Sequence, residues 1–503
     1  MKPLDGQKFD VAIIGAGING ASTAQHLTAA GYSVLVVDQD DFSNGASSRS
    51  SRLLHCGLRH LADGTSVGKM LLRPDRFVRS MGTVRADMIA RDEIARTIPE
   101  RVNPINFALP IYKDDPYAPW QLDAAFALLR MTSPKGESLD YRRYKPDQFD
   151  QVPIAPRLRD PDKLQAVAVF REFIFDWPER IALDALFDAR RMGAEVHNYM
   201  KVEELTSNED DGWDLRLNPT RREGQPFWVS ARMVLNLAGA WVDLVNAQTG
   251  NSAPRKCQGI KGIHIAVQLP PEFRDWGVFT YNSLGEPLYC LPWRGYHYVG
   301  LTRTKFFGDA TGVHATDQEI DWMLGETNRC LPSLSLTRKD VLYSWAGVNP
   351  LTFDKEQDLG SREIKIHDLA SDGMKGMFTL TGGPVVTHRR VAHRFVDRIR
   401  PILPPSLAPK EIRYTSAEIT NSKGAVSSEA IADSARTENP ESLADLMMRR
   451  LGLGWEADQG LAAAEQVAQV AAPHMGWSDK DIENELHAYQ VHLQRDRRKP
   501  SIE

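Results

Sequence analysis

A chain of 503 residues with 42% hydrophobic and 25% charged side chains has the composition of a globular protein, which excludes a disordered or membrane-embedded chain. Its net charge of −5 does not favour nucleic acid as a partner. The four cysteines form no CxxC pair, so we expect no disulfide framework, no metal site and a reducing, cytoplasmic compartment. No apolar run approaches the roughly 20 residues of a spanning helix and the start does not resemble a signal peptide, so we expect any membrane contact to be peripheral.

A strand, a glycine-rich turn, a helix and a second strand are predicted near the N-terminus. The apolar run Val11–Ile14 leads into Gly15-Ala16-Gly17-Ile18-Asn19-Gly20, a helical stretch follows, and Ser33–Asp38 predicts the next strand. This order is the βαβ opening of a dinucleotide-binding fold.

Each polar or small residue of that pattern has a physical task. Gly15 permits the tight turn, Gly17 lets backbone amides approach a pyrophosphate, and Gly20 lets helix and strand pack closely. The pyrophosphate would lie at the positive end of the helix. Asp38, at the end of the second strand, is placed to accept hydrogen bonds from an adenosine ribose. The sequence therefore predicts a dinucleotide site.

Later segments predict a second α/β piece and a second sheet. Ile181–Arg191 has the pattern of an amphipathic helix and Ala194–Val202 that of a strand, while the strand Trp228–Leu237 ends in the small residues Ala238, Gly239 and Ala240. Short strands that indicate a mixed or antiparallel sheet are expected at Ile263–Val267, Tyr289–Pro292, Tyr296–Thr302 and Lys365–His367.

The C-terminal part is predicted to be helical. The proline-rich segment 400–409 cannot continue a helix and is typical of a linker. Ser442 and Ser478 are expected to cap helices, and an alanine-rich helix is expected over Leu461–Ala472, ending at Pro473.

Residues 47–59 follow the pattern of a known family: Ser47-Ser48-Arg49-Ser50-Ser51-Arg52-Leu53-Leu54-His55-Cys56-Gly57-Leu58-Arg59. Here the chain resembles the FAD-dependent glycerol-3-phosphate dehydrogenases, members of the glycine/D-amino-acid oxidase-like flavoproteins. The likeness continues in the family's order through residues 236–242, 260–264, 291–293, 343–348, 381–389, 446–450 and 476–477.

The resemblance implies an α/β architecture: a Rossmann-like FAD-binding domain interleaved with a mixed or antiparallel-sheet substrate domain, plus a C-terminal helical domain. The expected division assigns 1–80, 165–250 and 355–400 to the FAD-binding domain, 81–164 and 251–354 to the substrate domain, and 401–503 to the helical cap domain.

The resemblance also implies a reaction, in which the carbinol of a small polyol gives a hydride to flavin and becomes a ketone. His264 matches the family's candidate base, with an ordinary pKa near 6.5, and His55 lies in the flavin-facing loop and shares that role. The residues expected to bind FAD are Gly15, Gly17, Gly20, Asp38, Ser47, Ser48, Arg52, Leu54, His55, Gly57, Val202, Ala238, Gly239, Trp241, Gly382, Gly383 and Thr387.

The expected substrate pocket departs from the family pattern. Arg59 and Arg362 match phosphate-contacting arginines, but Asn349 replaces another arginine and Pro384 replaces a lysine. Arg303 stands where the family usually has an acid, with Lys305 two residues on and therefore expected on the same face of a strand. Either these two cations rebuild an anion site for a differently shaped phosphate or anionic polyol, or they are solvated surface charges.

The expected substrate is glycerol 3-phosphate or a related polyol phosphate. The alternatives left open are an FAD-dependent amine or amino-acid oxidase and a non-catalytic flavoprotein. The basic stretch Arg389–Arg400 is either a solvated helix face or, as the resemblance allows, a peripheral contact with the cytoplasmic face of an inner membrane, where a quinone would accept the electrons. A homodimer is compatible with the same resemblance.

Overall fold

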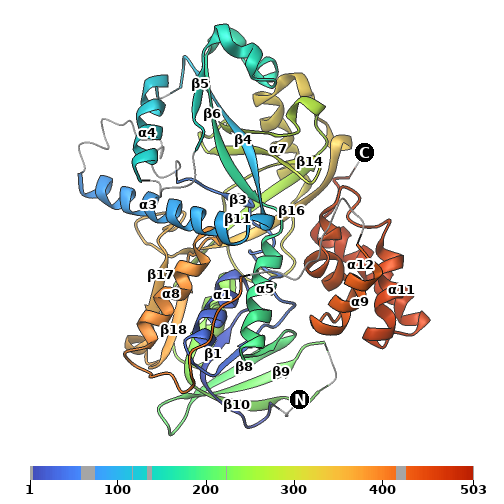
Figure 1. The fold of residues 1–503 in the computed structure, drawn as a ribbon. Coiled ribbons are helices and arrows are strands. Elements are labelled where there is room, and N and C mark those ends of the chain that lie inside the picture. The colour runs from blue at the N-terminus through green and yellow to red at the C-terminus, as the bar shows by residue number, and fades with distance from the viewer. Residues whose placement is uncertain are drawn as a thin grey trace.

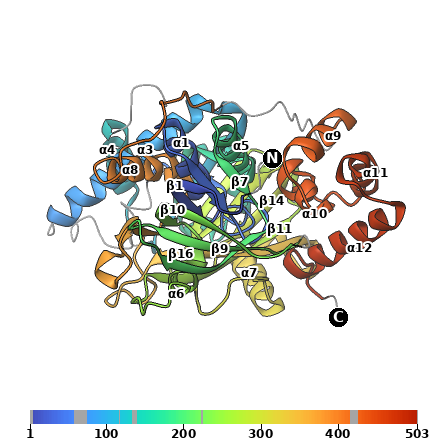
Figure 2. The ribbon, with the colours of Figure 1, turned by 90° about the horizontal axis from the view of Figure 1, so that it is seen from below.

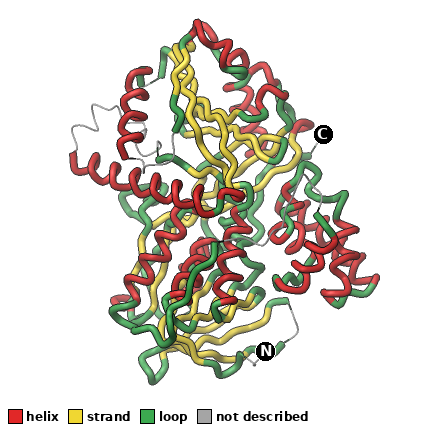
Figure 3. The backbone as a smooth tube through the Cα atoms, in the orientation of Figure 1, coloured by secondary structure: helices red, strands yellow, loops and turns green. Residues whose placement is uncertain are grey.

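The structure, a computed structural model, describes residues 4–57, 74–115, 117–132, 139–221, 224–414 and 426–501. Its strands form two sheets, which lie one above the other in Figure 1, and the helices that follow residue 426 pack at one side. Figure 3 separates the two groups of strands from the helices around them.

The first sheet holds the N-terminal pattern. Its strand order is β17-β18-β10-β1-β2-β7, with β9 pairing both β8 and β10, and β18, β10, β1, β2 and β7 run parallel. All four residues of β2 are buried, as expected for a parallel strand covered on both faces. The strands are β1 (Lys8–Ile14), β2 (Val34–Val37), β7 (Glu195–His197), β8 (Met200–Ser207), β9 (Trp213–Pro219), β10 (Phe227–Asn236), β17 (Lys365–Asp368) and β18 (Met377–Thr381).

Helices cover both faces of this sheet. Figure 2 shows α1, α5 and α8 together on one side, where α1 packs against the other two, and α6 on the other side. Their bounds are α1 (Ile18–Ala29), α5 (Pro178–Arg191), α6 (Val242–Ala247) and α8 (His388–Ile399).

The second sheet is mixed. It runs β15-β11-β14-β13-β12-β4-β6-β3, with β16 on β11 and β5 on β6, and β12 and β4 are its parallel pair. Helices α3 (Pro74–Thr97), α4 (Pro119–Thr132) and α7 (Asp317–Cys330) accompany it. Its strands are β3 (Leu53–Leu54), β4 (Val102–Tyr112), β5 (Arg142–Tyr144), β6 (Leu164–Phe175), β11 (Cys257–Val267), β12 (Trp276–Tyr281), β13 (Pro287–Trp293), β14 (Tyr296–Gly300), β15 (Thr304–Phe306) and β16 (Val341–Thr352).

The described C-terminal residues 426–501 form a helical unit, called the cap below. It contains α9 (Ser428–Thr437), α10 (Leu443–Asp445), a π-helical turn (Leu446–Arg450), α11 (Ala464–Met475) and α12 (Asp479–Asp496). One apolar cluster joins Trp345 of the second sheet to Trp455 of the cap, so the cap shares a core with the rest of the chain. Ser442 and Ser478 cap α10 and α12 as predicted.

Three expected elements differ from the structure. Residues 194–202 form two strands, because Tyr199 has φ +52 and breaks the run between β7 and β8. Lys365–His367 pairs in the first sheet, not the second. Helix α11 begins at Ala464 and runs through Pro473 to Met475, so this proline does not end it.

The mixed α/β fold class with a helical C-terminal unit is confirmed. Strands β3 and β6 belong to the second sheet, although their residues lie almost entirely within ranges expected for the FAD-binding domain. The division into three domains stays a prediction. In the part of the chain that the structure describes, every helix is too short or too polar to cross a membrane.

Candidate cofactor and substrate site

A cavity of about 1010 Å³ lies where the carboxyl ends of β1, β2 and β10 meet β11 and β16 of the second sheet. This is the edge at which open α/β sheets bind ligands. The cavity brings together most of the predicted site residues: Gly15, Gly17, Asp38, Ser47, Arg52, His55, Val202, Ala238, Gly239, Trp241, His264, Arg303, Asn349, Arg362, Gly382, Gly383 and Thr387.

Four predicted cofactor residues lie behind the cavity wall. Neighbouring residues of an extended chain face opposite sides, so Leu53 lines the cavity while Leu54 is buried in the apolar core. The Ser48 hydroxyl donates to the Gly45 carbonyl, and Gly57 packs against Val84. The fourth, Gly20, acts through packing, as described below. Arg59, predicted to bind substrate, lies outside the described residues.

The glycine turn leaves no room for side chains. Gly15 has φ +103, and a Cβ there would lie 2.6 Å from the Leu237 carbonyl oxygen. A Cβ on Gly20 would lie 1.9 Å from the Gly15 carbonyl oxygen, so Gly20 permits the helix to pack against the turn. Ser47 Oγ accepts a hydrogen bond from the Ile18 amide at 2.9 Å. The first turn of α1 contains no acidic residue, so its positive end is available to an anion.

Gly382 and Gly383 lie beside the glycine turn, although more than 360 positions separate them from it in the sequence. Asn19 Nδ2 of α1 donates to the Gly383 carbonyl at 2.6 Å, and both Gly382 and Gly383 have positive φ. The loop after β18 is thereby held against the N-terminus of α1.

Asp38 lies at the carboxyl end of β2. Its carboxylate accepts hydrogen bonds from the Ala16 amide at 2.7 Å and the Asp40 amide at 3.1 Å. The side chain is half-buried and lines the cavity, and desolvation raises its pKa to about 7 against the lowering effect of the two amides. Hydroxyl donors from a ribose would favour the charged form.

His264 of β11 is a buried polar residue of the cavity lining. Its ring stacks on Trp345 of β16 with centroids 4.9 Å apart, and Gly300 of β14 makes room for it, since a Cβ there would lie 2.3 Å from Cδ2. Neither ring nitrogen has a hydrogen-bond partner among the described residues. Burial, with a smaller effect of Arg52, lowers its pKa to about 3. The expectation of an ordinary pKa near 6.5 is therefore wrong, because the ring is desolvated.

Arg52 and His55 form the neighbouring wall. The Arg52 guanidinium lies in the core, where it donates to Glu179 at 2.7 and 3.1 Å. Its central carbon lies over the rings of Trp293 and Trp455, 4.2 and 4.0 Å from their centroids. His55 is partly exposed, with its ring centroid 5.8 Å from that of Tyr289.

The two cations expected to act together are separated. Arg303 lines the cavity and lies 4.0 Å from Glu286, whereas Lys305 pairs with Asp358 outside the cavity lining. The reason is that β14 ends at Gly300 and β15 begins at Thr304, so no single strand holds both. Arg362 is exposed and has no ion pair among the described residues, and Asn349 on β16 lies opposite Ile260.

Sequence reasoning did not assign several charged residues to the cavity lining, among them Arg390, Arg394, Arg495 and Asp496. Arg390 and Arg394 are four residues apart on α8 and share a face, a spacing visible in the sequence. Arg495 and Asp496 come from the end of α12, and no local sequence pattern indicates that the cap reaches the cavity.

The family model described as FAD dependent oxidoreductase (DAO) matches residues 10–389. The chain belongs to this family. It is 26% identical to a glycerol-3-phosphate dehydrogenase of Synechocystis over 550 aligned residues, which cover 97% of this chain and 96% of the relative.

Two solved structures extend the comparison. The glycerol-3-phosphate dehydrogenase of Bacillus halodurans complexed with FAD is similar over 99% of this chain and 97% of its own, with a TM-score of 0.73 and 21% identity. Glycine oxidase from Geobacillus kaustophilus is similar over 81% of this chain and all of its own (100%), with a TM-score of 0.57 and 19% identity. Both likenesses establish the fold.

The residues of this FAD-dependent oxidoreductase fit its cofactor. The glycine turn and the N-terminus of α1 could hold the pyrophosphate, because Gly15, Gly17 and Ile18, the first residue of α1, line the cavity. The Asp38 carboxylate could accept from the ribose, and His264, whose buried ring nitrogens have no hydrogen-bond partner among the described residues, lines the same cavity.

Proposed function

We propose that this enzyme oxidises the secondary hydroxyl of a small phosphorylated polyol, glycerol 3-phosphate or a related polyol phosphate, to a ketone. The observation that supports this proposal most is the buried imidazole of His264, which has no hydrogen-bond partner among the described residues. It shares one cavity with the cations Arg362 and Arg303. The names of the similar dehydrogenases support the same substrate class.

When bound, FAD would supply the acceptor for the hydride of the carbinol carbon. His264 receives the hydroxyl proton on one of its free ring nitrogens, so the C–H pair leaves as hydride, the O–H proton stays on imidazole and a carbonyl forms. In the free protein this imidazole is neutral and therefore ready to accept, but its pKa of about 3 makes it a weak base. A phosphate dianion in the same cavity opposes this shift, since a nearby negative charge stabilises imidazolium. His55 provides a second polar group at the same wall.

Arg362 and Arg303 hold the anion in this proposal. A guanidinium can donate two hydrogen bonds to a phosphate, and Arg362 is exposed and lines the cavity. Asn349 contributes a neutral donor in place of a third cation. Arg59, outside the described residues, keeps its predicted role as a further phosphate contact.

Anaerobic mixing of the purified holoenzyme with a panel of reductants tests the proposal. Glycerol 3-phosphate and other polyol phosphates should bleach the flavin, while free polyols, glycine and D-amino acids should not. Bleaching by amino acids alone would assign the enzyme to the amino-acid oxidases instead. No bleaching by any compound would show that the protein is a non-catalytic flavoprotein.

The proposal extends to a quinone acceptor and a peripheral site on the cytoplasmic face of a membrane. Support comes from α8, whose exposed face carries Arg390, His393, Arg394 and Arg398 next to the cavity. Flotation with anionic vesicles and reduction of a short-chain quinone test this extension. Failure of both would point to a soluble acceptor and a solvated helix face. The molar mass in solution, measured by light scattering, tests whether the protein forms the homodimer that the resemblance allows.

A further inference from the structure

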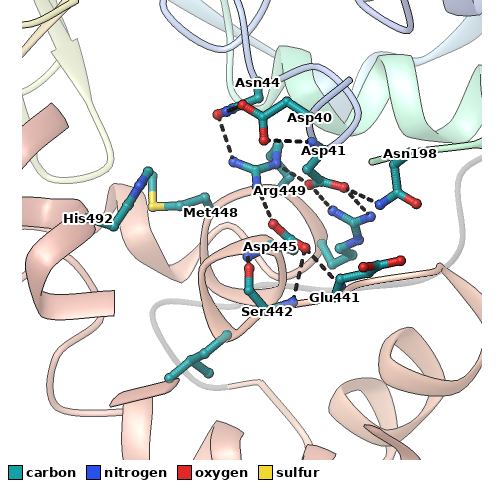
Figure 4. A network of polar contacts seen from close by, with 12 residues as sticks. Asp40, Asp41, Asn44, Asn198, Glu441, Ser442, Asp445, Met448, Arg449 and His492 are labelled. Carbon is teal, nitrogen blue, oxygen red and sulfur yellow. Dashed lines mark hydrogen bonds and ion pairs between the residues drawn. The ribbon is translucent and has the colours of Figure 1, made fainter. Parts of the chain in front are cut away.

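The cap contacts the loop that follows β2 through a buried network of charges (Figure 4). Asp41 is fully buried and accepts from two consecutive cap arginines, with Arg450 Nη2 at 2.7 Å from Oδ1 and both Arg449 Nε and Arg450 Nη1 on Oδ2. Asn198 Nδ2 also donates to Asp41, at 2.8 Å. Arg449 in turn donates to Asp445 at 2.7 Å.

A π-helical turn presents the two arginines together. The Leu451 amide donates to the Leu446 carbonyl, five residues back, at 2.8 Å, directly after the capping box of Ser442 and Asp445. Such wide single turns are rare and are frequent at functional sites. Here the wide turn lets neighbouring side chains reach one carboxylate.

The network continues to the residue predicted to hold the ribose. Asp40 accepts from the Asp41 amide at 2.9 Å and from Asn44 Nδ2 at 2.6 Å, and Asn44 accepts from Arg449 at 3.2 Å. The Asp40 amide then donates to Asp38 at 3.1 Å. Asp38, Asp40 and Asn44 all line the cavity. An unbroken path of hydrogen bonds therefore runs from the cap to the dinucleotide site.

A second cap contact flanks the same loop. Arg49, at the end of the loop, pairs with Asp496 of α12 at 3.2 Å and donates to the Val313 carbonyl at 3.1 Å. Asp496 and Arg495 are themselves part of the cavity lining. The cap thus holds residues 38–49, the dinucleotide loop, at both ends.

Burying so many charges costs more than an apolar contact would, so stability alone is a poor reason for this network. Buried ionic groups can instead fix a unique arrangement. The arginines keep Asp41 ionised, with its pKa lowered to about 2 despite burial. Asp41 is therefore a charged anchor of the loop, and its two arginine partners belong to the cap.

We propose that the cap is a positioning element for FAD: Arg449 and Arg450 hold the dinucleotide loop through Asp41 in the shape that receives the adenosine half of the cofactor. Cap docking and FAD binding are then coupled, and by thermodynamic reciprocity each strengthens the other by the same factor.

The test compares two cap variants in the full-length holoenzyme. Arg449→Gln breaks the contact with Asp41 and Asn44. Glu438→Gln is the matched control, because the Glu438 carboxylate forms an equally buried pair with Arg180 at 2.7 and 2.8 Å and has no hydrogen bond or ion pair with the described residues of the loop. The backbone carbonyl of Glu438 accepts from Arg450, and the side-chain substitution keeps that carbonyl. The measurements are the Kd for FAD by titration of the apoprotein and the rate of flavin release on dilution.

Arg449→Gln should raise the Kd for FAD about tenfold, the factor that corresponds to one weakened charge-assisted contact. Glu438→Gln should lower the melting temperature with less than a twofold change in this Kd, and Arg449→Lys should restore part of the affinity. Equal Kd values for Arg449→Gln and Glu438→Gln would overturn the proposal.

Hydrogen exchange on the unmodified protein gives a second test that needs no variant. Amides in residues 443–455 should exchange more slowly with FAD bound than in the apoprotein. The expected ratio of the two rates equals the factor by which cap docking strengthens FAD binding. If FAD protects only the first sheet and leaves these cap amides unchanged, the coupling does not exist.

Discussion

The two ends of the cavity are built differently. The dinucleotide end is built mainly from backbone groups. Hydrogen bonds fix the glycine turn, the N-terminus of α1 and the amide-bonded Asp38 before any ligand binds. At the substrate end, long side chains such as Arg362 and Arg303 lie at the wall around the desolvated ring of His264. The first end therefore depends on the backbone fold, whereas the second, where we propose that the substrate binds, depends on individual side chains.

The largest effect is expected at the chemical step. His264→Asn should slow anaerobic flavin reduction by about 10²–10⁴-fold, the usual contribution of a positioned acid or base. His297→Asn is the matched control, because His297 is an equally buried histidine of the same sheet that bonds to the Phe273 carbonyl at 2.9 Å. Equal reduction rates for both variants would remove His264 from the reaction.

The pH profile sharpens the same point. Because the pKa of His264 in the free protein is lowered to about 3, this imidazole is neutral throughout the neutral range. The parameter kcat/KM reports the ionisation of the free enzyme. Between about pH 5 and 8, the pH profiles of kcat/KM for the wild type and for His264→Asn should therefore have the same shape. A wild-type inflection near pH 6.5 that the variant lacks would show that the ring is solvated in solution.

The next effect is expected at the anion. Arg362→Ala should raise KM for a phosphorylated substrate by about 10–100-fold through the loss of charge-assisted hydrogen bonds, and leave the flavin spectrum intact. Lys305→Ala is the control, because Lys305 pairs with Asp358 outside the cavity lining. If Lys305→Ala raises KM as much as Arg362→Ala, the assignment of the anion to Arg362 is wrong.

The glycine turn predicts a stability difference. Gly20→Ala should destabilise the protein by about 1–3 kcal/mol, because its Cβ would overlap the Gly15 carbonyl oxygen. Gly325→Ala, within α7 with nothing near its Cβ, should stabilise the protein by roughly 0.5–1 kcal/mol. Melting temperatures of the two variants check the opposite signs, and a shift in the same direction would contradict the packing argument.

The smallest effect concerns Asp38 and pH. Its pKa of about 7 in the free protein means that FAD binding, which favours the carboxylate, releases a proton below that pH. FAD affinity should therefore fall by roughly tenfold per unit as pH drops well below 7. Asp38→Asn should bind FAD more weakly and lose this dependence. An unchanged slope in the variant would assign the titration to another group.

The sequence allowed the dinucleotide end to be predicted in detail, because Gly15, Gly17 and Asp38 act through local backbone geometry. The substrate end was harder, since the low pKa of His264 depends on Trp345 and Gly300 from other strands. Arg303 and Lys305 were expected on one strand, but the chain leaves the sheet between β14 and β15. Asp41 and Arg450 lie 409 positions apart, so no local pattern could reveal their pairing.

The most direct test of the central claim is the isotope effect on flavin reduction by glycerol 3-phosphate deuterated at its secondary carbon. Hydride transfer from that carbon predicts bleaching that is slower with the deuterated compound than with the unlabelled one, and a ketone as the product. Rapid bleaching with equal rates would place bond breaking elsewhere, and no bleaching by this or any related phosphate would contradict the proposed activity.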